Sequence, residues 1–361
     1  MKYKISIIIP TYNIEEFLRE TVGSIINQSI GFSNIELILV DDCSTDNTRT
    51  IINDYTKKYE NVLSIFLESN TGFPGKGRNL GIEAATGEYL MIMDHDDAYP
   101  EKACEIFYNT ITGENADIVV GRFKNFGEKT LESRSIKGDC VVESIYDNPD
   151  FLYLSPAAWT KIFKTRFIKD NNIRFLEDSL AEDLYFSSHA YFKSSKTVFI
   201  EDIIYLFRIR DSDVKSTSRL RNYKYTKSLL NGYYKVWELF IKEDGEYYFA
   251  RTLALHLTWW SRNFLQGDIK RDEKIELLKY AKELFLFLNK NDFKPKNKAY
   301  VEFFYFVANE EYEAALKIGK MVLEYEKIVN SNKKLKKDLK TLKNSKSWKI
   351  TKPLRKLKKQ I

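Results

Sequence analysis

Four short, almost entirely apolar runs alternate with amphipathic segments over residues 4–97, and this alternation limits the fold more than any other feature. The runs lie at 4–10, 35–40, 62–67 and 89–93, and the segments between them, at 14–28, after 44–46 and at 77–85, have helical apolar spacing. Runs of this length suit strands that are buried on both faces of a parallel sheet. The pattern therefore predicts an α/β fold, a mostly parallel sheet flanked by helices, with ligands at the carboxyl ends of the strands.

Carboxylates follow two of these runs. Asp41 and Asp42 come after the second run, where they could accept hydrogen bonds from a nucleobase or ribose or simply cap the next helix. Asp94, Asp96 and Asp97 come after the fourth run. Three carboxylates at one sheet edge repel one another, which suggests a bound cation, and their oxygens suit Mg or Mn. The alternative is a solvated turn before a helix whose N-terminus attracts acidic residues.

Basic residues lie in a glycine-rich turn and after a later strand. The turn at 71–81, TGFPGKGRNLG, is neither a Walker loop nor a dinucleotide-binding fingerprint, but its glycines allow close backbone approach to a ligand. Lys76 and Arg78 could contact a pyrophosphate there, and Arg208 and Arg210, which follow the predicted strand at 198–207, could add phosphate contacts. In both places the alternative is a set of solvated surface charges.

A carboxylate pair opens the predicted helix at 182–193. Glu182 or Asp183 could be a general base for an acceptor hydroxyl, although acidic residues in a first helical turn usually only complement the helix dipole. Trp159, in PAAWTKIFK, could stack on a sugar or fill the core.

The chain changes character near residue 220. A polar break at 211–219 precedes residues 223–330, whose apolar spacing near 3.6 predicts helices. We therefore predict an α/β domain at 1–220, an all-helical domain at 221–330 and a basic amphipathic tail at 331–361. The tail holds twelve Lys, one Arg and one Asp, so it carries +12 and the remainder of the chain carries −6.

The charge of the tail favours a peripheral contact with the inner face of an anionic membrane, and a solvated tail is the alternative. The acidic body argues against binding to nucleic acid. No apolar run approaches the ~18–20 residues that span a bilayer, and the N-terminus does not resemble a signal peptide, so we expect a cytoplasmic protein. Three Cys and three His are too few for a disulfide framework or a histidine-rich metal centre.

A heptad pattern precedes the end of the chain. Residues at alternating spacings of four and three form a possible coiled-coil seam: Met321, Tyr325, Ile328, Asn332, Leu335, Leu339 and Leu342. Asn332 takes an a position, which favours a parallel homodimer. We expect the lysines from Lys333 onward to repel across such a seam, and a single helix packed on its own domain is the alternative.

The motifs between Ile5 and about Arg210 together resemble family 2 glycosyltransferases with the GT-A fold, of the bacterial cell-surface polysaccharide type. The opening strand of that family is similar to ISIIIPTYN, and its nucleotide-binding turn is similar to VDDCSTDNT. The segment that ends in its DxD motif is similar to GRNLGIEAATGEYLMIMDHDD. Its mid-domain Trp segment is similar to WTKIFK, and its motif with the catalytic base is similar to AEDLYF.

The resemblance implies a metal-dependent, inverting transfer of a hexosyl or N-acetylhexosaminyl group from a nucleotide diphosphate sugar. UDP is the implied nucleotide, and the implied acceptor is a hydroxyl of a glycan or lipid-linked glycan in surface polysaccharide synthesis. Asp183 is the implied base, Glu182 a supporting contact, and Trp159 an acceptor contact. Asp97, helped by Asp96 and Asp94, is the implied ligand of Mn or Mg. The expected donor contacts are Pro10, Thr11, Tyr12, Asp42, Lys76, Arg78, Asp96, Arg208 and Arg210.

Two rivals to this function differ in the residues they require. A sugar-1-phosphate nucleotidyltransferase would need a basic glycine-rich loop after the first strand, where this chain has PTYN. A degenerate transferase that serves as a polysaccharide-binding or scaffold protein would not need Asp96, Asp97 and Asp183.

Overall fold

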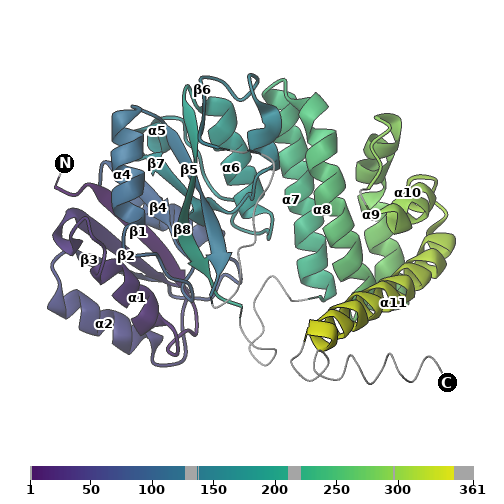
Figure 1. Cartoon of the computed structure of the whole chain (residues 1–361), viewed down its shortest axis with the longest axis horizontal. Coiled ribbons are helices and arrows are strands. Elements are labelled where there is room, and N and C mark those ends of the chain that lie inside the picture. Colours follow the sequence, from purple (N-terminus) through teal and green to yellow (C-terminus); the bar gives the residue numbers. More distant parts are fainter. Residues whose placement is uncertain (1, 127–135, 137, 210–220, 296, 345–361) are drawn as a thin grey trace, which may run out of the picture. The chain divides into compact units, whose positions relative to one another are not determined.

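The structure is a computed structural model that describes residues 2–126, 136, 138–209, 221–295 and 297–344 (Figure 1). The chain divides into two compact units, Met1–Leu253 and Ala254–Ile361. The first unit contains the predicted sheet and every residue proposed for the active site.

The first unit is built on an eight-stranded sheet within the described residues, in the order β3-β2-β1-β4-β7-β5-β8-β6. The strands are β1 (Ile5–Thr11), β2 (Ile35–Asp41), β3 (Val62–Phe66), β4 (Tyr89–Ile92), β5 (Ile118–Asn125), β6 (Cys140–Val142), β7 (Lys161–Lys164) and β8 (Thr197–Phe207). β1 to β4 are parallel to one another, and β5 is parallel to β8. The predicted mostly parallel sheet is therefore confirmed, with antiparallel β7 and β6 as additions.

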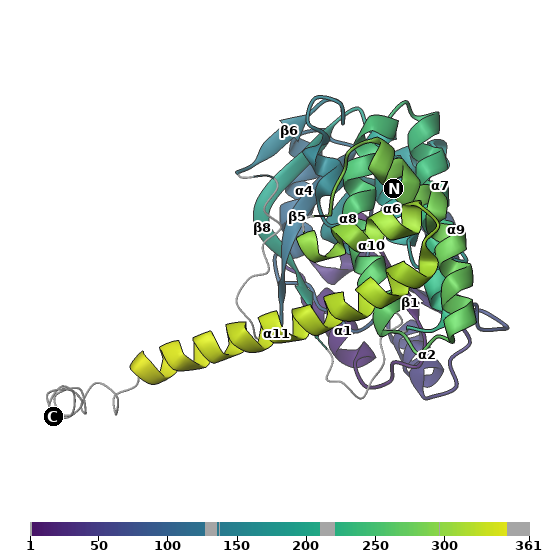
Figure 2. The same ribbon diagram turned by 90° about the vertical axis from the view of Figure 1, so that its right-hand side faces the viewer.

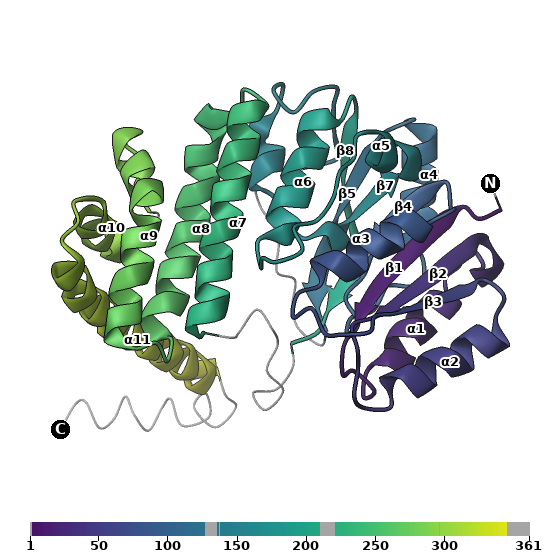
Figure 3. The same cartoon turned by 180° about the vertical axis from the view of Figure 1, so that it is seen from behind.

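Helices cover both faces of this sheet (Figures 1 and 3). α1 (Leu18–Ile26), α2 (Thr48–Lys58) and α4 (Ala103–Gly113) pack on the face that carries Ile5, Ile7 and Ile9. α3 (Gly75–Ala84) packs on the other face so closely that a Cβ added to Gly81 would lie 2.3 Å from Ile8 Cγ2. α5 (Thr165–Asp170) and α6 (Glu182–Lys193) complete the helices that lie before the segment at 210–220.

The predicted helical C-terminal region is confirmed. It comprises α7 (Tyr223–Lys242), α8 (Glu246–Gln266), α9 (Arg271–Lys290), α10 (Val301–Ala308) and α11 (Tyr312–Asn344). α7 belongs to the first unit and packs against the segment before α6, where Ser179 Oγ donates to Ser228 O at 2.9 Å. The predicted domain boundary at residue 220 falls outside the described residues and stays a prediction.

The second unit has its own aromatic core. Trp260 stacks on Phe264 with ring centroids 4.8 Å apart, and Phe285 and Phe303 pack beside them. Among the described helices, none is both long enough and apolar enough to cross a bilayer.

Candidate active site

The predicted site lies where the strand order reverses. β1 pairs with β2 on one side and with β4 on the other, so the loops after β1 and β4 lie at the same edge of the sheet. His95 Nδ1 lies 2.9 Å from Pro10 O and connects these loops. Thr21 Oγ1 donates to the backbone oxygens of His95 and Asp97 at 3.0 and 2.9 Å. These bonds tie residues 94–97, which we call the DHDD turn, to α1.

The loops after β1 and β2 contain unusual backbone conformations. Asn13 and Cys43, neither of them glycine, have φ values of 47° and 62°. The two loops hold each other, because Asn13 Oδ1 accepts from Thr45 N at 2.8 Å. Buried Asp41 anchors the second loop through Arg49 Nε at 2.5 Å. Residues held in such conformations occur preferentially at ligand sites, and the predicted donor contacts Pro10, Thr11 and Tyr12 lie directly beside them.

Asp42 is tied to the glycine-rich turn. Its carboxylate accepts from Thr71 N and Thr71 Oγ1, both at 2.9 Å, and from Asn70 Nδ2 at 3.0 Å. These bonds hold the end of β2 against the turn before α3. The structure places Asp42 half-buried at a strand end, as predicted, but its contact with a nucleobase stays a prediction.

Arg78 connects two acidic motifs that are distant in sequence. Its side chain is 3% exposed. Nη2 lies 2.9 Å from Asp94 Oδ1, and Nη1 lies 3.0 Å from both Glu182 Oε1 and Asp183 Oδ1. The helix carrying Arg78 reaches this position because Gly75 allows close approach, since a Cβ there would lie 1.9 Å from Leu176 O. One buried guanidinium therefore holds the DHDD turn beside the first turn of α6.

A single cation cannot neutralise three carboxylates, and the pKa values of the cluster show this imbalance. Burial alone would lower the pKa of Arg78, but Asp183, Asp94 and Glu182 together raise it. Burial, and then the Asp183 carboxylate, raises the pKa of Glu182 to about 8. Burial also raises the pKa of Asp183, and Arg78 opposes that rise. Glu182 Oε2 is buried without a hydrogen-bond partner among the described residues.

Asp97 points into the protein. Its Oδ2 accepts from the Tyr205 hydroxyl at 2.7 Å, and its Oδ1 accepts from Arg208 N at 2.6 Å. Burial, followed by repulsion from Asp96 and Asp94, raises the pKa of Asp97 to about 8. Arg208 Nε also donates to Asp96 O at 2.7 Å, so Arg208 binds the turn itself. The predicted donor contact of Arg208 and the metal role of Asp97 stay predictions, and Arg210 lies outside the described residues.

Two further residues near Asp183 lie deep in the fold. Trp159 is 7% exposed and stacks on Tyr205 with ring centroids 4.3 Å apart, so its predicted acceptor contact would need an edge of the ring. Lys161, fully buried at the start of β7, donates from Nζ to Ser155 O and Ala157 O at 3.0 and 2.8 Å. Burial lowers the pKa of Lys161 to about 7, and the attraction of Asp183 opposes this change.

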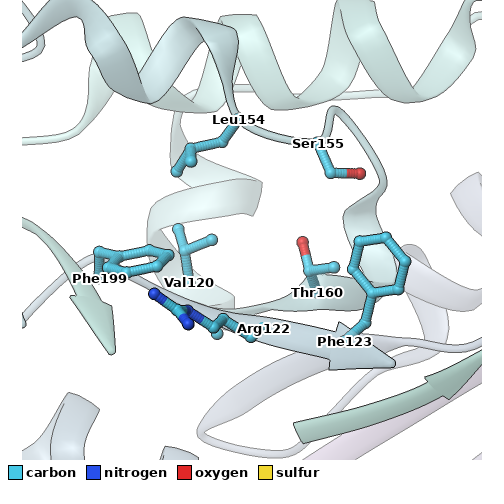
Figure 4. Close-up of a pocket in the computed structure, with 8 residues that line it drawn as sticks. Val120, Arg122, Phe123, Leu154, Ser155, Thr160 and Phe199 are labelled. Carbon is cyan, nitrogen blue, oxygen red and sulfur yellow. The ribbon is translucent and has the colours of Figure 1, made fainter. Parts of the chain in front are cut away.

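A pocket on the β5 side of the sheet contains none of the predicted site residues (Figure 4). Leu154 and Ser155 face Val120 and Thr160 across it, and Arg122 lies at its floor, where it pairs with Glu201 at 2.6 Å. We assign no ligand to this pocket.

The carboxylates of the DHDD turn are suitable ligands for a divalent cation, although none of them would hold the ion alone. No group of three or more His, Cys, Asp or Glu side chains in the described part of the chain is arranged to hold a metal. Mg²⁺ is usually held by one or two protein carboxylates together with substrate phosphates, so such a group is not required. Half-buried Asp94 and Asp96 offer those carboxylates, and repulsion from both adds to the effect of burial in raising the pKa of Asp97.

The structure thus brings together Asp94, Asp97, Glu182, Asp183 and Arg78, and it leaves Lys76 exposed on the first turn of α3. Sequence reasoning missed Tyr205 and Lys161. No clear signal in the sequence singled out Lys161, since Ile162 and Phe163 are flanked by a lysine on each side.

The chain is similar to known sugar transferases. Residues 6–175 match the family described as "Glycosyl transferase family 2". A poly(ribitol-phosphate) beta-glucosyltransferase of Bacillus spizizenii is 35% identical over 208 residues, which make up 57% of this chain and 32% of that protein. Glycosyltransferase GlyG of Streptococcus pneumoniae is 31% identical over 230 residues, 60% of this chain and 74% of that protein. The chain spans about a third of the length of several curated relatives that it matches.

The fold has a solved counterpart. The crystal structure of TarS 1-349 from Staphylococcus aureus in complex with UDP-GlcNAc matches with a TM-score of 0.70 at 22% identity, covering 89% of this chain and 92% of that one. This likeness confirms the predicted GT-A type of fold. Because the chain covers 74% of GlyG at 31% identity and its residues 6–175 match the family, it belongs to glycosyl transferase family 2.

Proposed function

We propose that this protein is an inverting glycosyltransferase that moves a hexosyl or N-acetylhexosaminyl group from a UDP-linked sugar to a hydroxyl of a glycan or lipid-linked acceptor. The observation that carries the proposal is the convergence of the DHDD turn and the Glu182–Asp183 pair on Arg78 at the carboxyl ends of parallel strands. The names of the relatives support a polyol-phosphate polymer of the cell surface as the acceptor. The UDP-GlcNAc complex of TarS supports a UDP-linked donor.

Asp183 is the proposed general base. It takes the proton of the acceptor hydroxyl while the acceptor oxygen forms its bond to the anomeric carbon. The bond from that carbon to the diphosphate oxygen breaks in the same step, and the nucleoside diphosphate leaves with the electron pair. Attack from the face opposite the leaving group inverts the anomeric centre. Burial strengthens Asp183 as a base, while Arg78 and Lys161 favour its ionised form.

The other residues of the site are assigned to the donor, to the DHDD turn or to the acceptor. Lys76 is exposed at the start of α3 and is the proposed contact for the diphosphate. A Mg or Mn ion held by Asp96 and Asp94 would neutralise the charge that develops on the leaving diphosphate. Asp97 keeps its predicted place among the metal ligands, and through Tyr205 and Arg208, from which its oxygens accept hydrogen bonds, it also positions the turn. Glu182 is the proposed supporting contact for the acceptor.

We place the enzyme on the cytoplasmic side, with the basic tail in contact with the inner face of the membrane. This part of the proposal rests on the charge of residues 331–361, of which 345–361 lie outside the described residues.

The test is hydrolysis of a panel of nucleotide sugars with and without Mn²⁺ or Mg²⁺, combined with calorimetric donor binding. Asp96→Ala should lose both hydrolysis and metal-dependent donor binding, whereas Asp183→Asn should lose turnover and keep most of its donor affinity. If Asp183→Asn lost donor affinity as severely as Asp96→Ala, a base separate from the metal site would be excluded. A wild-type protein that binds polysaccharide but turns over no donor would instead be a degenerate transferase with a binding or scaffold role.

A further inference from the structure

α11 changes its surroundings along its length. In its first half, Ala315, Gly319, Val322 and Glu326 are buried on one face, at spacings of four, three and four residues. Glu326 fixes this half to its own unit, because its Oε1 accepts from Arg262 Nη2 at 2.8 Å and from Asn297 Nδ2 at 3.0 Å. From residue 330 to 341 every residue is exposed. Figure 2 shows this second half extending beyond α9 and α10.

A row of exposed apolar side chains runs along a different face of the same helix. We call it the α11 seam, and it consists of Met321 (57% exposed), Tyr325 (57%), Ile328 (61%), Leu335 (65%) and Leu339 (48%), with Asn332 between Ile328 and Leu335. Single exposed apolar residues are common on protein surfaces. A row of them at alternating spacings of four and three residues is the pattern of a coiled coil. The exposure shows that this row is not the face by which the first half of α11 packs on its own unit.

We propose that the α11 seam pairs with the α11 seam of a second copy of this chain in a parallel, two-stranded coiled coil. In this register Tyr325, Asn332 and Leu339 occupy a positions, and Ile328 and Leu335 occupy d positions. Asn332 then faces its own copy across the seam, where paired amides specify a parallel dimer at some cost in stability.

The charges around the seam are compatible with this arrangement. Four of the lysines that we expected to repel lie at positions that face solvent in a coiled coil: Lys333 at b, Lys334 at c, Lys337 at f and Lys340 at b. Lys336, at e, borders the seam.

In a parallel pair each g residue lies next to the e residue five positions later in the partner. Glu324 would then meet Val329, and Ser331 would meet Lys336, so neither contact joins like charges. In an antiparallel pair the e residues of the two chains lie next to each other, which would bring lysines together. The charge pattern therefore favours the parallel orientation.

Light scattering of the full chain over a range of concentrations tests the pairing. We expect two chains per particle for the wild type and one for Leu335→Lys, which places a charge in the seam. Thr341→Lys adds the same charge at an exposed c position and should leave two chains per particle. Leu335 is 65% exposed and lies outside the proposed active site, so both variants should keep the wild-type rate of donor hydrolysis. A wild type with one or three chains per particle, or a Leu335→Lys variant that still pairs, would overturn the proposal.

Disulfide cross-linking tests the orientation. Asn332→Cys should form a covalent dimer under mild oxidation, because equivalent a positions meet across a parallel seam. Thr341→Cys carries the same native background of Cys43, Cys104 and Cys140 and should not cross-link above that of the wild type. Equal cross-linking in the two variants would rule out parallel pairing through this face.

Discussion

Replacing Arg78 by methionine is the sharpest test of the proposed site. Methionine keeps much of the length and apolar volume of the side chain, so the change mainly removes the charge and the hydrogen bonds. Asp94, Glu182 and Asp183 would then remain in the fold without their common cation. We expect both the stability of the first unit and the ionisation of the proposed base to change, each with its own dependence on pH.

The expected loss of stability follows from the burial of Arg78, whose side chain is 3% exposed. Removing one partner of a buried ion pair typically costs about 3–5 kcal/mol. For a domain of 150–250 residues this corresponds to a fall in Tm of about 6–20 °C.

The sign of the pH dependence follows from the raised carboxyl pKa values. An acid whose folded pKa lies above its unfolded pKa stabilises the fold below the unfolded value, and that contribution is lost as pH rises through the folded value. The pH range over which stability changes therefore runs from about 4, the ordinary carboxyl pKa, to the pKa of Glu182, which is about 8 in the wild type. Arg78 lowers the pKa of both Glu182 and Asp183, so its removal should raise them further. The fall in Tm caused by Arg78→Met should therefore be smallest near about pH 4 and reach its full size above pH 8, the pKa of Glu182 being about 8.

Thermal unfolding across this pH range provides the assay, with the pH profile of kcat/KM for donor turnover as a second readout. The acidic limb of that profile should move to higher pH in Arg78→Met, because the base would retain its proton longer. Arg166→Met is the matched control, since Arg166 is 83% exposed and pairs with Asp170 within α5 at 3.0 Å. That exposed pair should contribute less than about 0.5 kcal/mol. Our reasoning is refuted if Arg78→Met unfolds like the control, or if its loss of Tm is the same at both ends of the pH range.

Three further predictions concern the nucleotide, a buried lysine and the tail. Calorimetry should show that UDP binds more tightly than GDP or CDP and that Asp42→Ala reduces this preference; tighter binding of GDP or CDP would contradict the role given to Asp42. Burial lowers the pKa of Lys161 in the folded state to about 7, so the free energy of unfolding should rise between about pH 7 and 10 more steeply in the wild type than in Lys161→Met. Chemical denaturation at several pH values measures this, and equal slopes in the two proteins would contradict the prediction. Full-length protein should float with anionic vesicles at low salt and much less with neutral vesicles or at high salt, whereas protein that stays soluble with anionic vesicles would show that the tail is not an anchor.

The parts of the fold that sequence could predict are those set by local patterns. The apolar runs predicted β1 to β4 and β8 nearly to the residue. In β1, β2 and β4 every residue is buried, as the apolar runs predicted, whereas the edge strand β3 and the second half of β8 are partly exposed. β7 has only four residues and begins with Lys161, so neither its length nor its composition resembles such a run. The helix predicted from residue 14 begins at Leu18, since residues 15–17 form a turn instead.

For the site residues too, local sequence predicts some features, and other features depend on contacts with distant parts of the chain. The position of each carboxylate at a strand end or helix start follows from local sequence, and all of these positions were predicted. The partners of Arg78 lie 16, 104 and 105 residues away, so no local pattern could assign them. For that reason Arg78 was predicted to contact a donor phosphate, while the structure places its guanidinium among three carboxylates.

The position of Arg78 also changes the electrostatic argument for a metal. If Arg78 were directed at the donor, it could offset part of the charge of the diphosphate by itself. Both terminal nitrogens of its guanidinium instead pair with acidic side chains, and Lys161 donates to backbone oxygens. The carboxylates of the DHDD turn and of α6 therefore outnumber the cations beside them before any substrate enters. A diphosphate adds further negative charge, which protons on Asp97 and Glu182, whose pKa values are about 8, the side chain of Lys76 or a divalent cation could offset. The proposed base must be ionised for transfer, and this is why we include a divalent cation in the proposal.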